Sequence, residues 1–366
     1  MRYTMLDVPV GATPPRNLIQ TTRIDVLDGW RAISVALVVL SHLIGESALN
    51  IYFSPDFRGI ALNYGQIGVE FFFAISGFVI CSGLIREEAS AGSVSLRGFY
   101  IRRAFRILPP LWIYLSVVSA LSIARIVVVT PADFVSVITF TCNLPLPAPE
   151  HCSWPVGHTW SLAYEEQFYI VFPLLFILLG QKRRNAMTLI GVAMAVSLLL
   201  LYWTRAPSGV AGLRHFFSIT CGVLAAMYRE QLIVMLRKVP WPVFGLLAMV
   251  PFATQLAPWS SRLTWFSYLV GVGPAITIAM IGTTVSTKFR FLAWAPLTAV
   301  GRASYGIYLW QQLFTSDFGI ASPLLYFGGI ALMGVIVLVL YRTIEKPLIA
   351  AGRRLSQKQL VNPVLA

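Results

Sequence analysis

The sequence predicts an all-α fold: a polytopic membrane helix bundle with about ten transmembrane helices. Three observations support this prediction. Of the 366 residues, 57% are hydrophobic and only 12% are charged, whereas a soluble domain carries about 25% charged residues. Apolar segments of about 20 residues, the length that crosses the hydrocarbon core of a bilayer, recur along the chain. Basic residues gather between alternate segments, as they do in the cytoplasmic loops of membrane proteins.

The apolar segments follow one another without an internal repeat, a Gly/Ser-rich linker or a soluble domain of useful size. The stretch before the first segment is polar and contains proline, so we expect an uncleaved anchor helix and no cleavable signal peptide. We divide the chain into a cytoplasmic tail over 1–23, a transmembrane domain over 24–349 and a second cytoplasmic tail over 350–366. The expected spans are residues 30–49, 65–85, 107–129, 158–180, 186–204, 214–229, 240–257, 264–285, 297–315 and 323–343.

The positions of the basic residues predict the orientation of the bundle. With a cytoplasmic N-terminus, most of the 28 Lys and Arg residues fall in inside loops, and those that fall outside are Arg58, Arg205, Arg214 and Arg262. We therefore expect a multi-pass protein of the bacterial inner membrane with both termini in the cytoplasm. The net charge of +13 then reflects this loop bias, and it requires no nucleic-acid partner.

The four cysteines are spread along the chain without a CxxC spacing, so a metal site is not expected. Cys81 and Cys221 fall in apolar segments, where we expect them to pack as small hydrophobic residues. Cys142 and Cys152 share the loop 130–157, which the topology places outside. A disulfide between these two is compatible with an oxidising periplasm, and the sequence leaves it open.

Ionisable side chains inside a bilayer are costly, so they are functional candidates by default. Arg31 and His42 lie on the first expected helix, in the stretch DGWRAISVALVVLSHL. Their separation corresponds to about 16 Å of helix. We therefore expect Arg31 at the cytoplasmic face and His42 near the midplane or slightly beyond it. Two plainer interpretations stay open: Arg31 snorkels to the membrane surface, and His42 is a hydrogen-bonded core residue.

Three carboxylates also fall inside expected helices. Glu70 lies near the outer end of the second helix, and Glu165 and Glu166 are adjacent at the start of the fourth. His158, Ser161 and Glu165 recur at helical spacing, so they share a face, and Ser161 is placed to hydrogen-bond to Glu165. Polar residues that hold helices together are the plainer interpretation. Two adjacent acidic residues exceed what that role requires.

We expect the segment LRGFYIRRAFRILPP to be an inside loop whose proline pair opens the next helix. It carries Arg102, Arg103 and Arg106, and the topology places Arg302 and Glu345 on the same side of the membrane. Guanidinium groups bind phosphate through paired N–H donors, so these arginines predict a phosphate site that faces the cytosol. The alternative is that the arginines only enforce the topology.

Several blocks of the sequence, in the family's order, resemble the acyltransferase 3 family, integral-membrane enzymes that O-acylate carbohydrates and some other acceptors. The resemblance covers residues 24–349 approximately. Some members carry a C-terminal periplasmic hydrolase-like domain, and we expect none in this chain. The blocks are IDVLDGWRAISVALVVLSH, GQIGVEFFFAISGFVI, LRGFYIRRAFRILPP, HTWSLAYEEQFYIVFPLLF, VGRASYGIYLWQQLF and YRTIEKPL.

The resemblance implies that Arg31, His42, the cytoplasmic arginines and Glu345 are required for activity. The chain departs from the family at two positions. Many members have His where this chain has Gln311, so a catalytic His is absent there and we assign Gln311 no role in chemistry. Glu70 stands where Asp is usual, which keeps the charge but moves it by one methylene.

We expect a hydroxyl group to attack a carbonyl beside His42, because a neutral imidazole near pH 7 can accept the hydroxyl proton. Glu46, at i+4, is placed to orient the imidazole, and we expect Glu70 and Glu165 to share the polar pocket. The chain has no G-x-S-x-G motif, which disfavours an acyl-enzyme on Ser. The expected catalytic residues are His42, Glu70, Glu165 and Glu166, and weaker candidates are His151, His158 and His215.

The expected activity is transfer of an acetyl group from acetyl-CoA to a hydroxyl of a cell-surface or exported polysaccharide or oligosaccharide, which includes lipid-linked saccharides. Acyl-CoA is a substrate, and we expect no tightly bound cofactor, no metal and no partner beyond the substrates and membrane lipid. Two alternatives stay open: an acyltransferase for a secondary metabolite such as a macrolide, and a secondary transporter or exporter of a saccharide. The expected donor-binding residues are Arg31, Arg102, Arg103, Arg106, Arg302 and Glu345.

Overall fold

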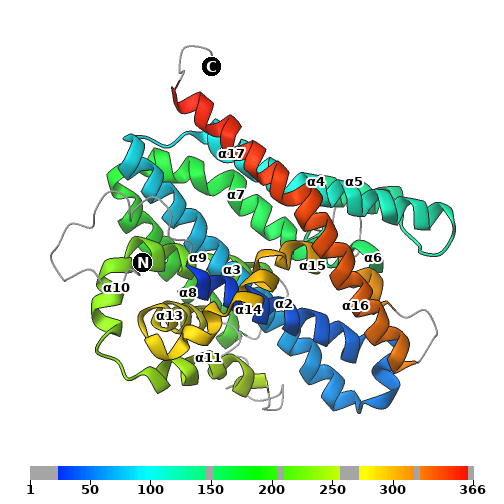
Figure 1. The fold of residues 1–366 in the computed structure, drawn as a ribbon. Coiled ribbons are helices and arrows are strands. Elements are labelled where there is room, and N and C mark those ends of the chain that lie inside the picture. Colours follow the sequence, from blue (N-terminus) through cyan, green and yellow to red (C-terminus); the bar gives the residue numbers. More distant parts are fainter. Residues whose placement is uncertain (1–23, 145–151, 205–209, 256–271, 317–321, 362–366) are drawn as a thin grey trace.

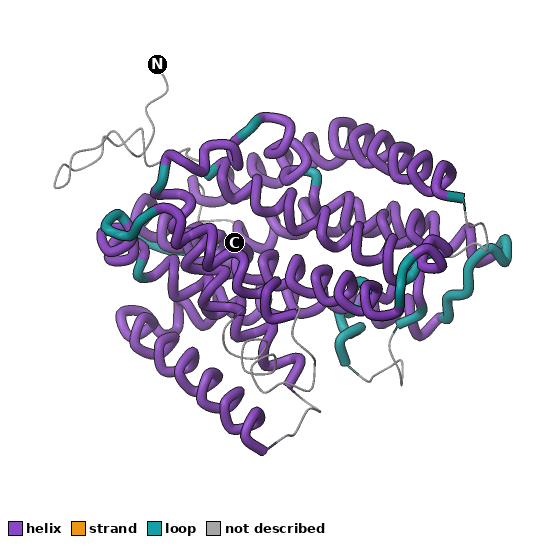
Figure 2. Tube along the Cα trace, turned by 90° about the horizontal axis from the view of Figure 1, so that it is seen from below, coloured by secondary structure: helices purple, strands orange, loops and turns teal. Residues whose placement is uncertain are grey.

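The structure is a computed structural model that describes residues 24–144, 152–204, 210–255, 272–316 and 322–361. Every regular element in these ranges is a helix (Figures 1 and 2). The principal helices are α2 (Asp25–Gly45), α3 (Pro55–Ala91), α4 (Leu96–Ile123), α5 (Pro131–Ile138), α6 (Trp154–Gly157), α7 (Thr159–Leu179), α8 (Arg183–Thr204), α9 (Val210–Met227), α10 (Arg229–Leu236), α11 (Trp241–Gln255), α13 (Val272–Val285), α14 (Ala295–Arg302), α15 (Ser304–Thr315), α16 (Pro323–Leu340) and α17 (Lys346–Val361).

The apolar helices are those of a membrane protein, and the predicted all-α class is confirmed. Five runs among the described residues are long and apolar enough to cross a bilayer, and a sixth is counted if α9 and α10, which meet at an angle of 83°, form one broken crossing. Shorter apolar helices lie within α11 and α13. Within the described residues the expected number of about ten spans is therefore not confirmed. The runs long and apolar enough to cross a bilayer are Asp25–Gly45, Pro55–Ala91, Leu96–Ile123, Trp154–Leu201 and Pro323–Gln357.

The arginine-rich segment that the sequence analysis expected to be a loop is helical. Helix α4 begins at Leu96, where the Ser95 side chain accepts a hydrogen bond from the Gly98 amide, and it continues through Pro109 and Pro110. Proline removes a backbone donor inside a helix. Pro109 and Pro110 cannot donate to the Phe105 and Arg106 carbonyls one turn earlier, and the Tyr305 hydroxyl of α15 donates to the next carbonyl along, that of Ile107. The arginines therefore have fixed directions around a helix axis.

The expected span 297–315 is also different, because the structure divides it into α14 and α15 at Ala303. Helix α14 packs along α2 and α15 packs against both α2 and α16. Near the C-terminus, α16 and α17 form one long helical rod, and α17 packs against α4 (Figure 1). Residues 350–361 thus continue a packed helix within the segment expected to be a tail.

Helices α2, α3 and α9 form the centre of the bundle. A Cβ atom added to Gly77 of α3 would lie 2.0 Å from the Ile219 carbonyl oxygen, and one added to Gly222 of α9 would lie 2.0 Å from the Ala74 carbonyl oxygen. These two backbones therefore touch at a crossing that only glycine permits. The crossing fixes α3, which in turn holds α2 and the side chains that α2 presents.

Candidate active site

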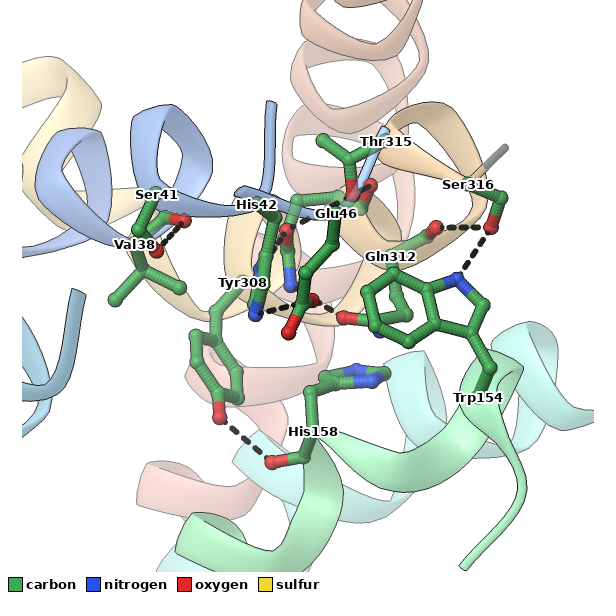
Figure 3. A network of polar contacts seen from close by, with 11 residues as sticks. Val38, Ser41, His42, Glu46, Trp154, His158, Tyr308, Gln312, Thr315 and Ser316 are labelled. Atoms are coloured by element: carbon green, nitrogen blue, oxygen red, sulfur yellow. Dashed lines mark hydrogen bonds and ion pairs between the residues drawn. The ribbon is translucent and has the colours of Figure 1, made fainter. Parts of the chain in front are cut away.

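His42 lies in the last turn of α2, where it faces α15 (Figure 3). The sequence analysis expected it near the middle of its span, but α2 begins at Asp25 and ends at Gly45, so His42 lies close to one helix end. Its Nδ1 atom is 2.8 Å from Oε1 of Gln311. An amide oxygen only accepts hydrogen bonds, so in this arrangement Nδ1 carries the hydrogen. The Nε2 atom of a neutral His42 then keeps a free lone pair.

Gln311 and Gln312 together fix this contact. The Nε2 group of Gln311 donates to Oε1 of Gln312 at 3.0 Å, which leaves the Gln311 oxygen directed at His42. Both glutamines are buried. The sequence analysis gave Gln311 no role in chemistry because the histidine of many family members is absent at this position, and the structure places Gln311 in direct contact with the expected base.

Two further ionisable side chains lie beside His42. Glu46 Oε2 is 3.6 Å from His42 Nε2, at the position that the i+4 spacing indicated. His158 is buried at the start of α7, and its charge interacts with that of His42. Sequence reasoning ranked His158 below His42 because it was expected near a helix end. It does lie at the helix end, but the fold carries that end into the cluster (Figure 3).

The segment that the sequence analysis expected outside the membrane, here called the outer segment (residues 130–144 and 152–153), leads into this cluster through Trp154. Cys142 and Cys152 form a disulfide, which settles the pairing that the sequence left open. Asp133 accepts hydrogen bonds from the Ser153 amide at 2.9 Å and the Ser153 hydroxyl at 2.6 Å. Burial raises the pKa of this carboxyl, but the bonds from Ser153 and Thr130 outweigh it and hold the pKa below its usual value.

The segment then continues into the site through Trp154. The Trp154 indole N–H donates to the Ser316 hydroxyl at 2.7 Å, and its ring meets the His42 ring edge-on at 5.8 Å. Ser316 directly follows α15, the helix that carries Gln311. The outer segment, through Trp154, and α15, through Gln311, therefore both restrict the position of the imidazole.

A cavity of about 80 Å³ lies beside the arginines, and Tyr308, whose hydroxyl donates to the His158 carbonyl, connects it to the His42 cluster. Arg31, Arg103 and Arg106 line it, together with Tyr305 and Tyr308 of α15. Arg103 stacks over the Tyr169 ring at 4.4 Å. This volume holds several water molecules and is too small for a thioester arm without side-chain movement.

Three of the arginines expected at the donor site have carboxylate partners, and Arg31, which lines the cavity, lies 3.7 Å from Asp28. Arg102 is about 100° around α4 from Arg103, and it forms an ion pair with Glu87 at 2.6 Å. Arg302 ends α14 and lies 3.7 Å from Asp25 and 3.6 Å from Asp28, at the start of α2. The sequence predicts on which side of the membrane Arg102 and Arg302 lie, but it does not predict the direction of each side chain.

Glu345 is buried within a short π-helical turn, Tyr341–Glu345, that joins α16 to α17. π-helical turns are frequent at functional sites. The charge of Glu345 interacts with that of Arg106, which fits the expectation that this carboxylate holds an arginine.

Glu165 and Glu166 separate onto two environments, as their adjacent positions require. Glu165 lines the arginine cavity, where it accepts hydrogen bonds from Ser76 at 2.7 Å and from Tyr169 at 3.0 Å. Glu166 is buried, and its charge interacts with that of Arg103. Neither contacts His42. Ser161, which was expected to hydrogen-bond to Glu165, bonds instead to the Tyr308 hydroxyl at 2.6 Å.

Glu70 is not part of the His42 cluster. Its Oε1 atom is 3.0 Å from Arg214 Nε and 2.7 Å from His215 Nδ1, across the contact between α3 and α9. Arg214 was expected in an outside loop and is buried instead. The structure therefore places Glu70 and His215 in a separate ion-pair network, and His151 lies outside the described residues.

Tyr308 is the residue that sequence reasoning missed between the two regions. It lines the arginine cavity, and Figure 3 shows its ring beside His42. Its hydroxyl donates to the His158 carbonyl oxygen at 2.6 Å. The only available signal was its position three residues before Gln311, which places both on one face of a helix.

Comparison with known proteins identifies the family. The family model described as an acyltransferase domain matches residues 24–342. The O-acetyltransferase OatA of Staphylococcus aureus strain NCTC 8325 / PS 47 is 25% identical over 364 residues, which cover 89% of this chain and 57% of OatA. OatA of strain COL gives the same values. The chain thus spans little more than half the length of these relatives, and no solved structure matches it. The chain belongs to the acyltransferase 3 family.

Proposed function

We propose that this protein is an O-acetyltransferase of the bacterial inner membrane, with both termini in the cytoplasm. It transfers an acetyl group from acetyl-CoA to a hydroxyl of a cell-surface or exported saccharide. The observation that carries the proposal is the contact between His42 Nδ1 and Gln311, because it leaves Nε2 able to accept a proton next to a cavity lined by arginines. The family match and the OatA similarity support the reaction class.

The reaction needs one base and no covalent enzyme intermediate. The acceptor oxygen attacks the thioester carbonyl carbon while His42 Nε2 takes the hydroxyl proton. The tetrahedral intermediate then collapses, the carbon–sulfur bond breaks, and the imidazolium returns its proton to the departing thiolate. The products are an acetyl ester and free coenzyme A, and His42 is neutral again.

Arg31, Arg103 and Arg106 are the donor-binding residues in this proposal, with Glu345 positioning Arg106. Coenzyme A carries several phosphates, and planar guanidinium groups grip phosphate in a way that a lysine ammonium does not. The thioester arm would pass from these arginines along Tyr308 to His42. The small volume of the cavity means that side chains there, Tyr308 among them, must move as the arm enters.

The activity is tested with His42→Ala in cells that lack the native gene, with ester-linked acetyl measured on surface glycans by mass spectrometry. We expect a loss of about 10²–10⁴-fold in transfer from a normally inserted protein. The matched control is His215→Ala, which changes a histidine outside the cluster. Normal acetylation by a well-expressed His42→Ala protein would overturn the assignment. Loss of glycan export without loss of acetyl per glycan would instead indicate a transporter.

The donor site is tested with purified variants and acetyl-CoA binding at several salt concentrations. Arg103→Lys and Arg106→Lys should weaken binding although the charge is kept. Arg102→Lys is the matched control, because Arg102 is paired with Glu87 on another face of α4. Equal weakening by all three substitutions, or by none, would show that these arginines act as topology signals and that the donor binds elsewhere.

A further inference from the structure

The partner of His42 is a neutral amide, although carboxylates are common partners for a histidine base. Gln311 Oε1 and His42 Nδ1 are 2.8 Å apart, and the contact joins a buried glutamine to a partly exposed imidazole. A group that accepts from Nδ1–H holds the imidazole in one tautomer and one orientation. A carboxylate at this position would also stabilise the imidazolium, whereas an amide supplies orientation alone.

We propose that Gln311 is a positioning residue that fixes the reactive tautomer of His42 without adding charge, and that Gln312 sets the direction of the Gln311 amide. This inference rests on the proposed role of His42 as the base. It gives Gln311 a role in chemistry through the imidazole, with no contact to substrate. A substitution at position 311 can therefore change the basicity of His42 through a single side chain.

The surroundings of His42 make this effect measurable. The ionisable groups that face the imidazole are Glu46 after α2, His158 before α7 and Tyr308 of α15 (Figure 3). Glu46 is 3.6 Å from Nε2, on the opposite side of the ring from Gln311. Burial raises the pKa of Glu46 to about 7, so below that pH this neighbour is mostly protonated. A carboxylate introduced at 311 would add charge on the Nδ1 side.

The experiment compares kcat and KM of purified enzyme across pH for Gln311→Leu and Gln311→Glu. Gln311→Leu removes the acceptor, so kcat should fall about 10–100-fold while KM for acetyl-CoA stays unchanged, because the wrong tautomer binds substrate but cannot take the proton. Gln311→Glu restores an acceptor and adds charge. It should recover activity above the Leu variant and move the acid limb of the rate profile upward by about one to three pH units.

Gln167→Glu provides the matched control, because Gln167 bonds to Asn143 and the Phe140 carbonyl away from His42. It should leave the acid limb in place. Thermal unfolding in detergent checks that each variant is folded, and Gln312→Leu should reproduce a weaker form of the Gln311→Leu defect. A folded Gln311→Leu enzyme with parental kcat, or a Gln311→Glu enzyme with an unmoved acid limb, would overturn the inference. An active His42→Ala enzyme would instead overturn the proposed function.

Discussion

The buried network of Glu70 and Arg214 provides a direct test of what the carboxylate does. The sequence places Glu70 among the expected catalytic residues, whereas the structure pairs it with Arg214 and His215 between α3 and α9. The test uses Glu70→Gln, Arg214→Met and the double variant. A structural ion pair predicts that the double variant is more stable than Glu70→Gln alone, because the second change removes the charge that the first leaves uncompensated.

The magnitudes follow from burial and distance. The Glu70 and Arg214 side chains are 3% and 4% exposed, with 3.0 Å between the charged atoms. Removing one member of a buried pair costs about 3–5 kcal/mol, and we expect Glu70→Gln to reach this range. Arg214→Met should cost less, about 1–3 kcal/mol, because Glu70 keeps His215 at 2.7 Å and the imidazole can carry the compensating charge. The double variant should return to within about 1 kcal/mol of the parent.

The assay is thermal unfolding in a mild detergent, with acetyl transfer measured on the same samples. The loss for Glu70→Gln corresponds to about 4–7 °C in Tm for a chain of this size. The double variant should recover most of that shift, and activity should recover with it. The reasoning is refuted if the double variant is no more stable than Glu70→Gln. Recovered stability without recovered activity would indicate that Glu70 takes part in the reaction, as the sequence analysis expected.

Two other predictions concern packing and pH. Gly222→Ala should destabilise the protein by about 1–3 kcal/mol, since its Cβ would lie 2.0 Å from the Ala74 oxygen. Gly83→Ala in α3, with no atom within 4 Å of its Cβ, should be neutral or stabilising in the same thermal assay. The pKa of Asp133 is depressed, so its hydrogen bonds should stabilise the outer segment above its unfolded pKa of about 3.9 and be lost as the pH falls through the lower folded value. Pepsin cleavage of this segment, measured relative to an unstructured peptide in the same samples, should therefore rise as the pH falls below about 3.9 in the parent, and this ratio should change little with pH for Asp133→Asn.

The sequence predicts the fold class well, but it predicts little of where helices begin and end and of how they pack. Composition and apolar segment length predict a helical membrane protein, because both follow from the solvent. Helix bounds were less predictable: the proline pair in α4 suggested a helix start, yet the helix runs through both prolines and ends at Ile123. The hydrogen bond that joins α15 to this part of α4, from Tyr305 to the Ile107 carbonyl, connects residues almost two hundred positions apart and has no local signal.

The site shows the same division. The spacing of His42 and Glu46 on one helix is a local property, and the structure brings them together. Gln311 reaches His42 only through the packing of α15 against α2, and His158 only through the packing of α6 against α15, neither of which periodicity can predict. Glu70 was grouped with His42 because both are ionisable groups in apolar segments. The pairing partner that explains Glu70, Arg214, was expected in a loop.

The helical form of the segment before Pro109 limits how its length can vary. One inserted or deleted residue between Leu96 and Arg103 would rotate every following side chain by about 100° relative to those before it. The face that carries Arg103 and Arg106 would turn away from the cavity, and Arg102 would no longer meet Glu87. A single substitution on the exposed side of α4 leaves the directions of the other side chains unchanged. An insertion or deletion changes them all, so this stretch should keep a fixed length in proteins that keep the cavity.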